Sequence, residues 1–387
     1  MIMQHSSKES DTALIIAVAA GMYISITSSN FSPLLIGILA DSGIVAEITG
    51  AYILALEICA IPVATFVVLP FIRHVNRQRL AIAGVIFATI AQSVSPLFLE
   101  NYDLFITRFC VGLGLGCVYA AVNSVGATSK NPDKVFGYST AITFLLYAIT
   151  QPLMSMTIGN FGFSGACFFL TTAGLISLLL IRNFPREPSI VQQQKAEVNW
   201  GYYMALLITI ILFNLAAGTT WAFVERVGVS RFGLDIEIIG LILGTGTAAG
   251  VVGAYSASWA YTRLGRINSI LCGLVLFGAT GYGITNSTTI PVYTGSIILY
   301  WFVYLFLYPL LFSAAAELDR SGRLATITGG LLWLAVGIGP AVGGLIASRY
   351  SYDMIGWFSF FCCVLAVPCF FWVGRYLETR IERTSKA

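Results

Sequence analysis

Residues 47–70 read EITGAYILALEICAIPVATFVVLP. After Glu47 at its start, this stretch carries a single charged side chain, Glu57, and a membrane-spanning helix needs about 20 mostly apolar residues. The whole chain has the same character, because 57% of its 387 residues are hydrophobic and 10% are charged. Soluble domains carry about 25% charged residues. The composition therefore predicts a membrane protein of many spans, with no polar stretch long enough for a soluble catalytic domain.

Similar apolar runs recur along the sequence, and together they predict twelve transmembrane helices. An all-α membrane protein of this kind uses about 240 residues for its spans. The first run starts at Ala13 and is too long for the apolar region of a signal peptide, so we expect it to remain as a span. The expected spans are 13–39, 47–70, 80–98, 102–126, 135–159, 164–182, 200–224, 237–261, 268–285, 290–316, 324–348 and 354–376.

The basic residues predict the orientation of these spans. With both termini inside, all but four of the 21 Lys and Arg residues lie in cytoplasmic segments. The four others are Arg108, within a span, and Arg226, Arg231 and Arg349, in outer segments. Cytoplasmic loops are enriched in Lys and Arg. We therefore expect a multi-pass protein of the inner (plasma) membrane with cytoplasmic N- and C-termini.

An internal repeat relates the two halves of the chain. The sequence EITG at 47–50 returns as EIIG at 237–240, an offset of about 190 residues, and the same offset places Arg73 opposite Arg263. A fixed offset of this kind indicates a duplicated unit. Two parallel repeats of six spans are a known transporter architecture, in which the halves are related by a pseudo-two-fold axis and the substrate binds between them.

The polar stretch between the repeats predicts the domain limits. It contains two prolines and three consecutive glutamines, a composition typical of a flexible linker. We expect an N-terminal six-helix bundle at 1–182, a cytoplasmic linker at 183–199 and a C-terminal six-helix bundle at 200–387.

Four short motifs have the sequence features of a known transporter family. Residues 104–116 read LFITRFCVGLGLG, an arginine followed by spaced glycines, and 263–266 read RLGR. Residues 73–79, RHVNRQR, are the basic counterpart of that second motif in the first half, and 339–344 read GPAVGG. With these motifs, the chain resembles the major facilitator superfamily over essentially its whole length.

This resemblance implies rocker-switch transport of a small solute by alternating access, often driven by protons. It also implies that the basic loop residues form a gate or loop motif: Arg73, Arg77, Arg263, Gly265 and Arg266. In antiporters of the family, span 5 carries the pattern Gly-Pro-x-x-Gly-Gly. Span 5 here reads QPLMSM from 151 to 156 and keeps only the proline. The resemblance therefore supports the superfamily better than it supports antiport.

Glu57 and Arg108 are the candidate residues for proton coupling. Glu57 lies about ten residues into its span, roughly 15 Å from the outer end at 1.5 Å per residue. A charged group near the bilayer centre is costly and is often functional. A carboxyl group in apolar surroundings binds a proton more readily, which suits proton exchange near neutral pH. Arg108 differs from Glu57 in depth by about 6 Å, so the two can pair. A switching pair, a static pair and no contact all remain possible.

Polar and aromatic residues near mid-span are candidates for the lining of a substrate cavity. Such faces in membrane helices serve either a cavity or helix–helix hydrogen bonds and packing. The candidates are Asn30, Tyr119, Asn123, Tyr147 and Gln151 in the first half, and Asn214, Tyr304 and Trp333 in the second. At the end of span 7, Glu225 and Arg226 are most simply a solvated helix end, with an outer gate as the alternative.

These observations favour a secondary active transporter over an enzyme. The two histidines, His5 and His74, lie in polar segments, and the eight cysteines lack metal-ligand spacing. We expect no cofactor, no metal and no nucleic acid, and a monomer whose partners are a small-molecule substrate, protons and membrane lipids. Within transport we favour efflux. Uptake of a small organic anion or nutrient by symport or facilitation remains open, as does a membrane receptor without transport.

Overall fold

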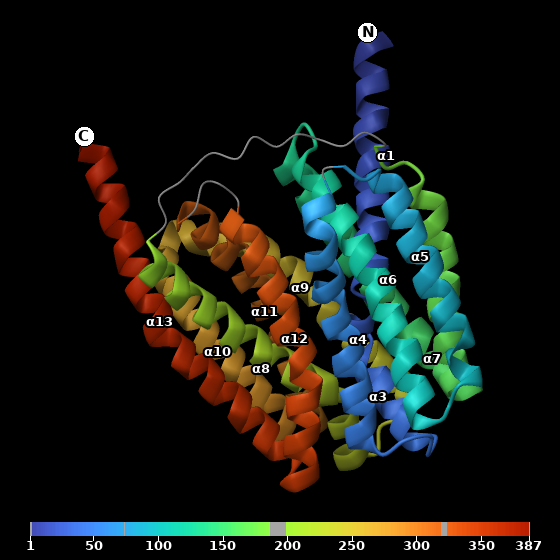
Figure 1. The fold of residues 1–387 in the computed structure, drawn as a ribbon. Helices are drawn as coiled ribbons and strands as arrows, with labels where there is room; N and C mark the ends of the chain where they lie inside the picture. Colours follow the sequence, from blue (N-terminus) through green and yellow to red (C-terminus); the bar gives the residue numbers. More distant parts are fainter. Residues whose placement is uncertain (1, 73, 186–198, 319–322, 387) are drawn as a thin grey trace. The chain divides into compact units, whose positions relative to one another are not determined.

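A computed structural model describes residues 2–72, 74–185, 199–318 and 323–386 (Figure 1). Within these ranges every regular element is a helix, so the predicted all-α membrane fold is confirmed. Ten of the described helices are long and apolar enough to cross a membrane, and two shorter apolar helices precede them. Arg73 and most of the predicted linker lie outside the described residues.

The chain divides into two compact units, Met1–Val191 and Gln192–Ala387. The predicted domain limits themselves stay a prediction. The first unit contains α1 Ile2–Ser25, α2 Thr27–Asn30, α3 Ser32–Asp41, α4 Glu47–Val68, η1 Leu69–Phe71, α5 Arg77–Val94, η2 Ser95–Leu97, α6 Asn101–Ala127 and α7 Pro132–Ile181. The second contains α8 Trp200–Phe232, α9 Ile236–Leu264, α10 Arg266–Asn286, α11 Ile290–Leu318, α12 Arg323–Arg349 and α13 Tyr352–Lys386.

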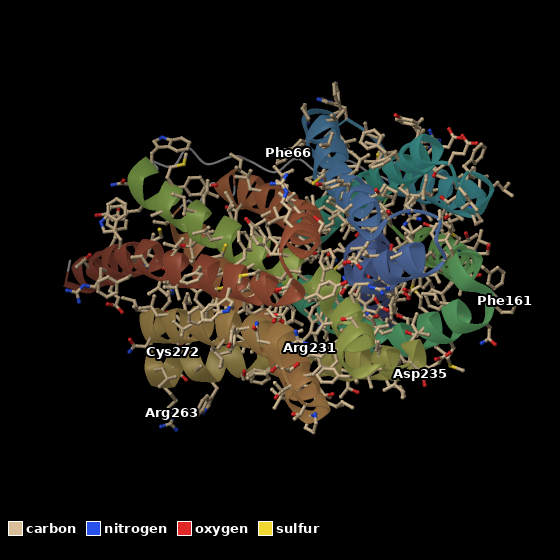
Figure 2. All side chains as sticks on the ribbon, turned by 90° about the horizontal axis from the view of Figure 1, so that it is seen from below. Phe66, Phe161, Arg231, Asp235, Arg263 and Cys272 are labelled. Atoms are coloured by element: carbon tan, nitrogen blue, oxygen red, sulfur yellow. The ribbon has the colours of Figure 1, made fainter. Side chains whose placement is uncertain are left out.

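Helix α7 contains two of the predicted spans. Its 50 residues would extend about 75 Å as one helix, more than twice the bilayer core of about 30 Å. The helix turns at Gly162, whose φ of 59° and ψ of −143° suit only glycine. The two arms then run close together, because a Cβ at Gly165 would lie 2.1 Å from the carbonyl oxygen of Thr157. Phe161, at the tip of this hairpin, is exposed (Figure 2).

The first predicted span is divided rather than continuous. Helix α1 ends at Ser25, and Ile26 (φ −119°, ψ 15°) and Phe31 (φ −95°, ψ 5°) leave the helical conformation on either side of the four-residue α2. Helix α3 then completes the crossing. With nine single spans, the two arms of α7 and this divided span, the helices account for the twelve predicted spans.

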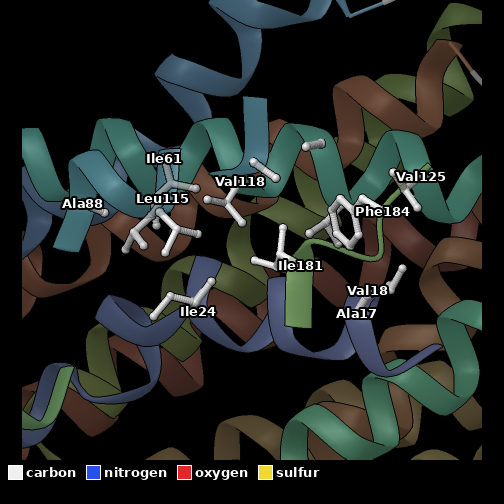
Figure 3. Close-up of a cluster of buried hydrophobic side chains, with 14 of the residues drawn as sticks. Ala17, Val18, Ile24, Ile61, Ala88, Leu115, Val118, Val125, Ile181 and Phe184 are labelled. Carbon is white, nitrogen blue, oxygen red and sulfur yellow. The ribbon is translucent and has the colours of Figure 1, made fainter. Parts of the chain in front are cut away.

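The core of the first unit lies between α1, α4, α5, α6 and the second arm of α7. Figure 3 shows the apolar side chains that meet there, including Ile24, Ile61, Ala88, Val118 and Ile181. All five are less than a tenth exposed. Large apolar side chains elsewhere point outward from the helices: Val67, Ile106 and Trp259 are each more than 60% exposed. A membrane protein exposes such residues to lipid.

The spaced glycines of α6 bring three helices into backbone contact. A Cβ at Gly112 would lie 2.1 Å from the carbonyl oxygen of Glu57 on α4, and one at Gly116 would lie 2.4 Å from that of Ile61. Gly114 faces the other way, and a Cβ there would lie 2.7 Å from the carbonyl oxygen of Gly84 on α5. Small residues allow this close approach, which drives helix association in membranes.

The second unit packs its helices in the same pairs as the first. Helix α8 packs on α12 as α1 packs on the first arm of α7, and α9 packs on α11 as α4 packs on α6. The GPAVGG motif serves the first of these contacts, because a Cβ at Gly339 would lie 2.4 Å from the carbonyl carbon of Gly218. The motif therefore functions in helix packing within this unit.

The end of span 7 differs from the sequence-based expectation. Helix α8 continues through Phe232, so Glu225 and Arg226 lie within it. Glu225 is 1% exposed and Arg226 is 9% exposed. The expectation of a solvated helix end is therefore wrong. The apolar run ends at Val224 in the sequence, but the helix itself does not end there.

Candidate functional site

A buried ion pair joins α4 and α6 in the first unit. Glu57 and Arg108 are each 1% exposed. The Nε atom of Arg108 donates a hydrogen bond of 2.7 Å to Oε2 of Glu57, and Nη2 of Arg108 lies 2.7 Å from the same oxygen. Both residues come from predicted spans, and the structure places them in the direct contact that the depth estimate allowed.

The glycines of α6 explain why the pair meets. Gly112 follows Arg108 by one helical turn, and its missing side chain lets the α6 backbone touch the carbonyl of Glu57. At this height the two helices are too close for large side chains between them. The Glu57 and Arg108 side chains therefore meet beside this contact.

Two neutral side chains complete the cluster. Ser28 of α2 donates a hydrogen bond to Oε1 of Glu57. Oε1 of Gln92, on α5, accepts a hydrogen bond of 2.7 Å from Nη1 of Arg108. We call Ser28, Glu57, Gln92 and Arg108 the polar cluster; it takes one residue from each of four helices.

Sequence analysis missed Gln92 and gave Ser28 no specific role. The available signal for Gln92 was a lone amide within the apolar span at 80–98, where an unpaired polar group would be costly. No comparable signal distinguishes Ser28 from its hydroxyl-bearing neighbours, because the break in the first span decides which of them turns toward Glu57.

The cluster pairs one negative and one positive charge in the interior of the first unit. Both oxygens of Glu57 have hydrogen-bond donors, and Arg108 has an acceptor besides Glu57. A buried pair of this kind is stable only while both charges are present, since removing one leaves the other without compensation. Adding a proton to Glu57 would therefore leave Arg108 as a buried cation that attracts an anion.

The predicted cavity residues Tyr147 and Gln151 lie between helices. Tyr147 donates a hydrogen bond to the carbonyl of Tyr23, and Nε2 of Gln151 donates one of 2.9 Å to the carbonyl of Asn30. Both donors are 0% exposed. In this conformation they serve the second of the two roles considered for them, helix–helix hydrogen bonding.

Tyr119 and Asn123 lie one turn apart on α6. The amide of Asn123 donates a hydrogen bond of 2.9 Å to the carbonyl of Tyr119. Both side chains are half-buried. They therefore share a helix face that is more accessible than the polar cluster.

In the second unit, Asn214 and Tyr304 meet. The Tyr304 hydroxyl donates a hydrogen bond of 3.2 Å to Oδ1 of Asn214. The Tyr304 ring stacks on Phe213, with centroids 5.4 Å apart, and lies parallel to Tyr300 at 6.4 Å. Trp333, on α12, is 8% exposed. Tyr304 is thus a half-buried member of a row of rings on α8 and α11, which continues to Tyr308 and Phe312.

The basic loop motifs differ in their contacts. Arg77 donates hydrogen bonds to the Ser124 carbonyl (3.3 Å) and the Thr128 hydroxyl (2.5 Å) at the end of α6. Arg266 forms a bidentate ion pair with Glu317 at the end of α11. Arg263 points away from its unit (Figure 2).

Gly265 links Arg263 to Arg266 and caps α10 with a φ of 77°, which glycine adopts without strain. The motif thus fixes one arginine to a neighbouring helix and leaves the other exposed. Among the residues whose side chains are described, no group of three or more His, Cys, Asp or Glu could hold a metal ion.

Two helical units whose helices are long and apolar enough to cross a membrane, with the polar cluster inside the first, have the architecture of a membrane transporter. The model of the Major Facilitator Superfamily matches residues 13–331. The chain therefore belongs to the major facilitator superfamily, whose members carry small molecules across membranes. This fits the expectation that it is not an enzyme.

Two known proteins illustrate the relationship. The chain is 20% identical over 301 residues to the uncharacterized MFS-type transporter YceJ of Bacillus subtilis (strain 168), covering 73% of this chain and 75% of YceJ. Its fold is similar to the crystal structure of the human organic anion transporter MFSD10 (TETRAN). That match has a TM-score of 0.66 at 15% identity and covers 93% of this chain and 99% of MFSD10.

Proposed function

We propose that this transporter couples solute movement to protons through Glu57 and Arg108. The observation that carries the proposal is the ion pair itself, 2.7 Å between Nη2 and Oε2 with both side chains 1% exposed. Ionisable residues at such depth in membrane proteins commonly mark proton relays and substrate pathways. The Glu57 carboxylate is the proton acceptor, and Arg108 is the group whose interactions change when the proton arrives.

The other members of the polar cluster support this exchange. When Glu57 is neutral, its attraction for Arg108 falls to that of an ordinary hydrogen bond. The hydrogen bond from Nη1 of Arg108 to Gln92 remains. The guanidinium therefore keeps its orientation while its positive charge becomes available to an anion. An anionic group of the substrate then takes the place of the carboxylate, and release of that group restores the pair.

The transported solute is a small organic molecule, and efflux is the favoured direction. The row of rings that includes Tyr304, with Trp333, suits an aromatic or amphipathic solute in the second unit. Asn30, Tyr119 and Asn123 supply polar groups in the first. The transporter works as a monomer in the plasma membrane with both termini cytoplasmic, and Arg77, Arg263, Gly265 and Arg266 belong to its inner gate.

A second candidate is proton symport or facilitated uptake of a small organic anion. Arg108 favours it, because a buried guanidinium is a binding group for carboxylate and phosphate. The printed name of the structural neighbour MFSD10, an organic anion transporter, agrees with this chemistry. A receptor that does not transport is the remaining alternative.

Metabolite profiling tests these proposals together. Small molecules are measured by untargeted mass spectrometry inside and outside cells that express the wild type or Glu57→Gln, at two external pH values. Efflux predicts a compound depleted inside wild-type cells only, and uptake predicts one that accumulates. Proton coupling predicts that this difference depends on pH in the wild type and loses that dependence in Glu57→Gln.

Glu47→Gln is the matched control, because it changes an acid of the same helix at its first residue. It should transport with the pH dependence of the wild type. Retention of pH-dependent transport in Glu57→Gln would refute the proton site, and the absence of any difference between expressing and non-expressing cells would favour the receptor.

A further inference from the structure

A regular ladder of hydrogen bonds joins α1 to the first arm of α7. Every fourth residue of α7 donates a side-chain hydrogen bond to a backbone carbonyl of the first span. The four bonds are Ser139 to Ile15 (2.9 Å), Thr143 to Ala19 (3.1 Å), Tyr147 to Tyr23, and Gln151 to Asn30 (2.9 Å). All four donors are 0% exposed.

The ladder changes register at the break in the first span. The first three bonds join residues 124 positions apart, whereas the fourth joins residues 121 positions apart. A ladder of constant register would pair Gln151 with the carbonyl of Thr27. The observed partner, Asn30, lies three residues further on, about 4.5 Å along a regular helix. Seven residues of the first span thus lie opposite four of α7.

The shift coincides with the non-helical residues Ile26 and Phe31, which flank α2. Ser28 lies at the centre of this segment. Its hydroxyl donates to Glu57, whereas the hydroxyls of Ser25 and Thr27 donate to carbonyls of the first span three residues earlier. The contact therefore connects the shape of the first span to the ion pair.

The strength of the Ser28 contact depends on the charge of its acceptor. A hydrogen bond to an ionised carboxylate is roughly twice as strong as one between neutral groups. The groups that face Glu57 are Arg108 of α6, Ser28 of α2 and the Cys167 thiol of α7, with Gln92 of α5 behind Arg108. Of these, Arg108 carries charge and Ser28 alone belongs to the first span.

We propose that Ser28 is a positioning residue that makes the register between the first span and α7 depend on the charge of Glu57. With Glu57 ionised, Ser28 holds residues 26–31 in the broken form, and Gln151 pairs with Asn30. With Glu57 neutral, the segment relaxes to a continuous helix, and Gln151 moves to the carbonyl of Thr27. This inference rests on the proposed function only in taking Glu57 as the group that gains and loses a proton.

Hydrogen–deuterium exchange of the backbone amides at 26–31 tests the proposal without a substrate. The full chain is measured in lipid nanodiscs as the wild type, Glu57→Gln, Ser28→Ala and the double variant. The amides of Asn30 and Phe31 already bond to the carbonyls of Ile26 and Thr27 (3.1 and 2.9 Å). A continuous helix would pair the amides at 27–29 with carbonyls four residues earlier as well, so exchange at 27–29 should slow. We expect each single variant to slow exchange about fivefold, which corresponds to about 1 kcal/mol. The double variant should slow it no further.

Ser25→Ala is the matched control, because it removes a hydroxyl three residues away that bonds only to the carbonyl of Met22. It should exchange as the wild type does. Unchanged exchange in Ser28→Ala, or effects of Ser28→Ala and Glu57→Gln that multiply in the double variant, would overturn the proposal. Loss of pH-dependent transport in Glu57→Gln with unchanged exchange would leave the proton site standing and refute the register change alone.

Discussion

Glu57 and Arg108 stabilise the first unit only as a pair. Each is 1% exposed, so deleting one partner leaves the other charge buried and uncompensated. We expect Arg108→Met to lower the free energy of unfolding by about 3–5 kcal/mol. The double variant Glu57→Leu/Arg108→Met removes both charges and should recover most of that loss. Thermal unfolding of the purified protein in detergent measures both effects.

Arg263→Met provides the reference for this comparison, because Arg263 is exposed and points away from its unit. Its melting temperature should match that of the wild type, since exposed substitutions usually change stability by less than about 0.5 kcal/mol. If the double variant were less stable than Arg108→Met, each of the two charges would be stabilised mainly by groups other than its partner.

At the scale of single residues, the sequence predicted how deep a side chain lies in the membrane but not which neighbouring helix it faces. The positions of Glu57 and Arg108 within their spans placed them about 6 Å apart along the membrane normal, close enough for contact. The side on which a residue faces depends on helix packing, which one sequence does not reveal. Ser28 and Gln92 therefore had no assigned partners before the structure. For the same reason the polar face of Gln151 was consistent with either a cavity or a helix contact.

At the scale of helices, hydropathy predicted the spans and missed their irregularities. Helices α9, α10, α11 and α12 begin and end within a few residues of the predicted spans. The break at 26–31 escaped prediction because average hydropathy does not respond to two residues with altered φ and ψ. The extension of α8 to Phe232 escaped because Glu225 and Arg226 end the apolar run while the backbone continues as a helix.

Gly112 sets the spacing of α4 and α6, and its substitution tests that contact. In Gly112→Ala the new Cβ would lie 2.1 Å from the Glu57 carbonyl oxygen, so the helices must separate. Overpacking of this kind costs about 1–3 kcal/mol, and it should also lengthen the Glu57–Arg108 contact. We therefore expect a lower melting temperature together with weaker transport of whichever solute metabolite profiling identifies.

Gly137→Ala is the control for this substitution. Gly137 lies in α7, and a Cβ there would meet nothing within 4 Å. Its melting temperature should equal or exceed that of the wild type, because alanine favours a helix over glycine by about 1 kcal/mol. Equal stability of Gly112→Ala and the wild type would show that α4 and α6 can separate at no cost.

At the scale of the molecule, the two units share their helix pairing but not their chemistry. At the repeat offset of 190 residues, Glu57 corresponds to Thr247, whose hydroxyl bonds to the carbonyl of Leu243 within its own helix. Arg108 corresponds to Ile298, an uncharged residue. The duplicated fold therefore holds the Glu57–Arg108 pair in the first unit, and the corresponding positions of the second unit carry no charge. This difference is the ground for proposing proton exchange in the first unit.

Reporter fusions at three points test the membrane topology of the whole chain. The distribution of Lys and Arg predicts that Lys130 and Asn183 face the cytoplasm, while the α7 hairpin tip at Phe161 faces outward. Chains truncated at these residues are fused to green fluorescent protein, which is active inside, or to alkaline phosphatase, which is active outside. We expect fluorescence at Lys130 and Asn183 and phosphatase activity at Phe161. Fluorescence at all three points would mean that α7 does not cross the membrane twice, and the reverse pattern would invert the chain and place the basic residues outside.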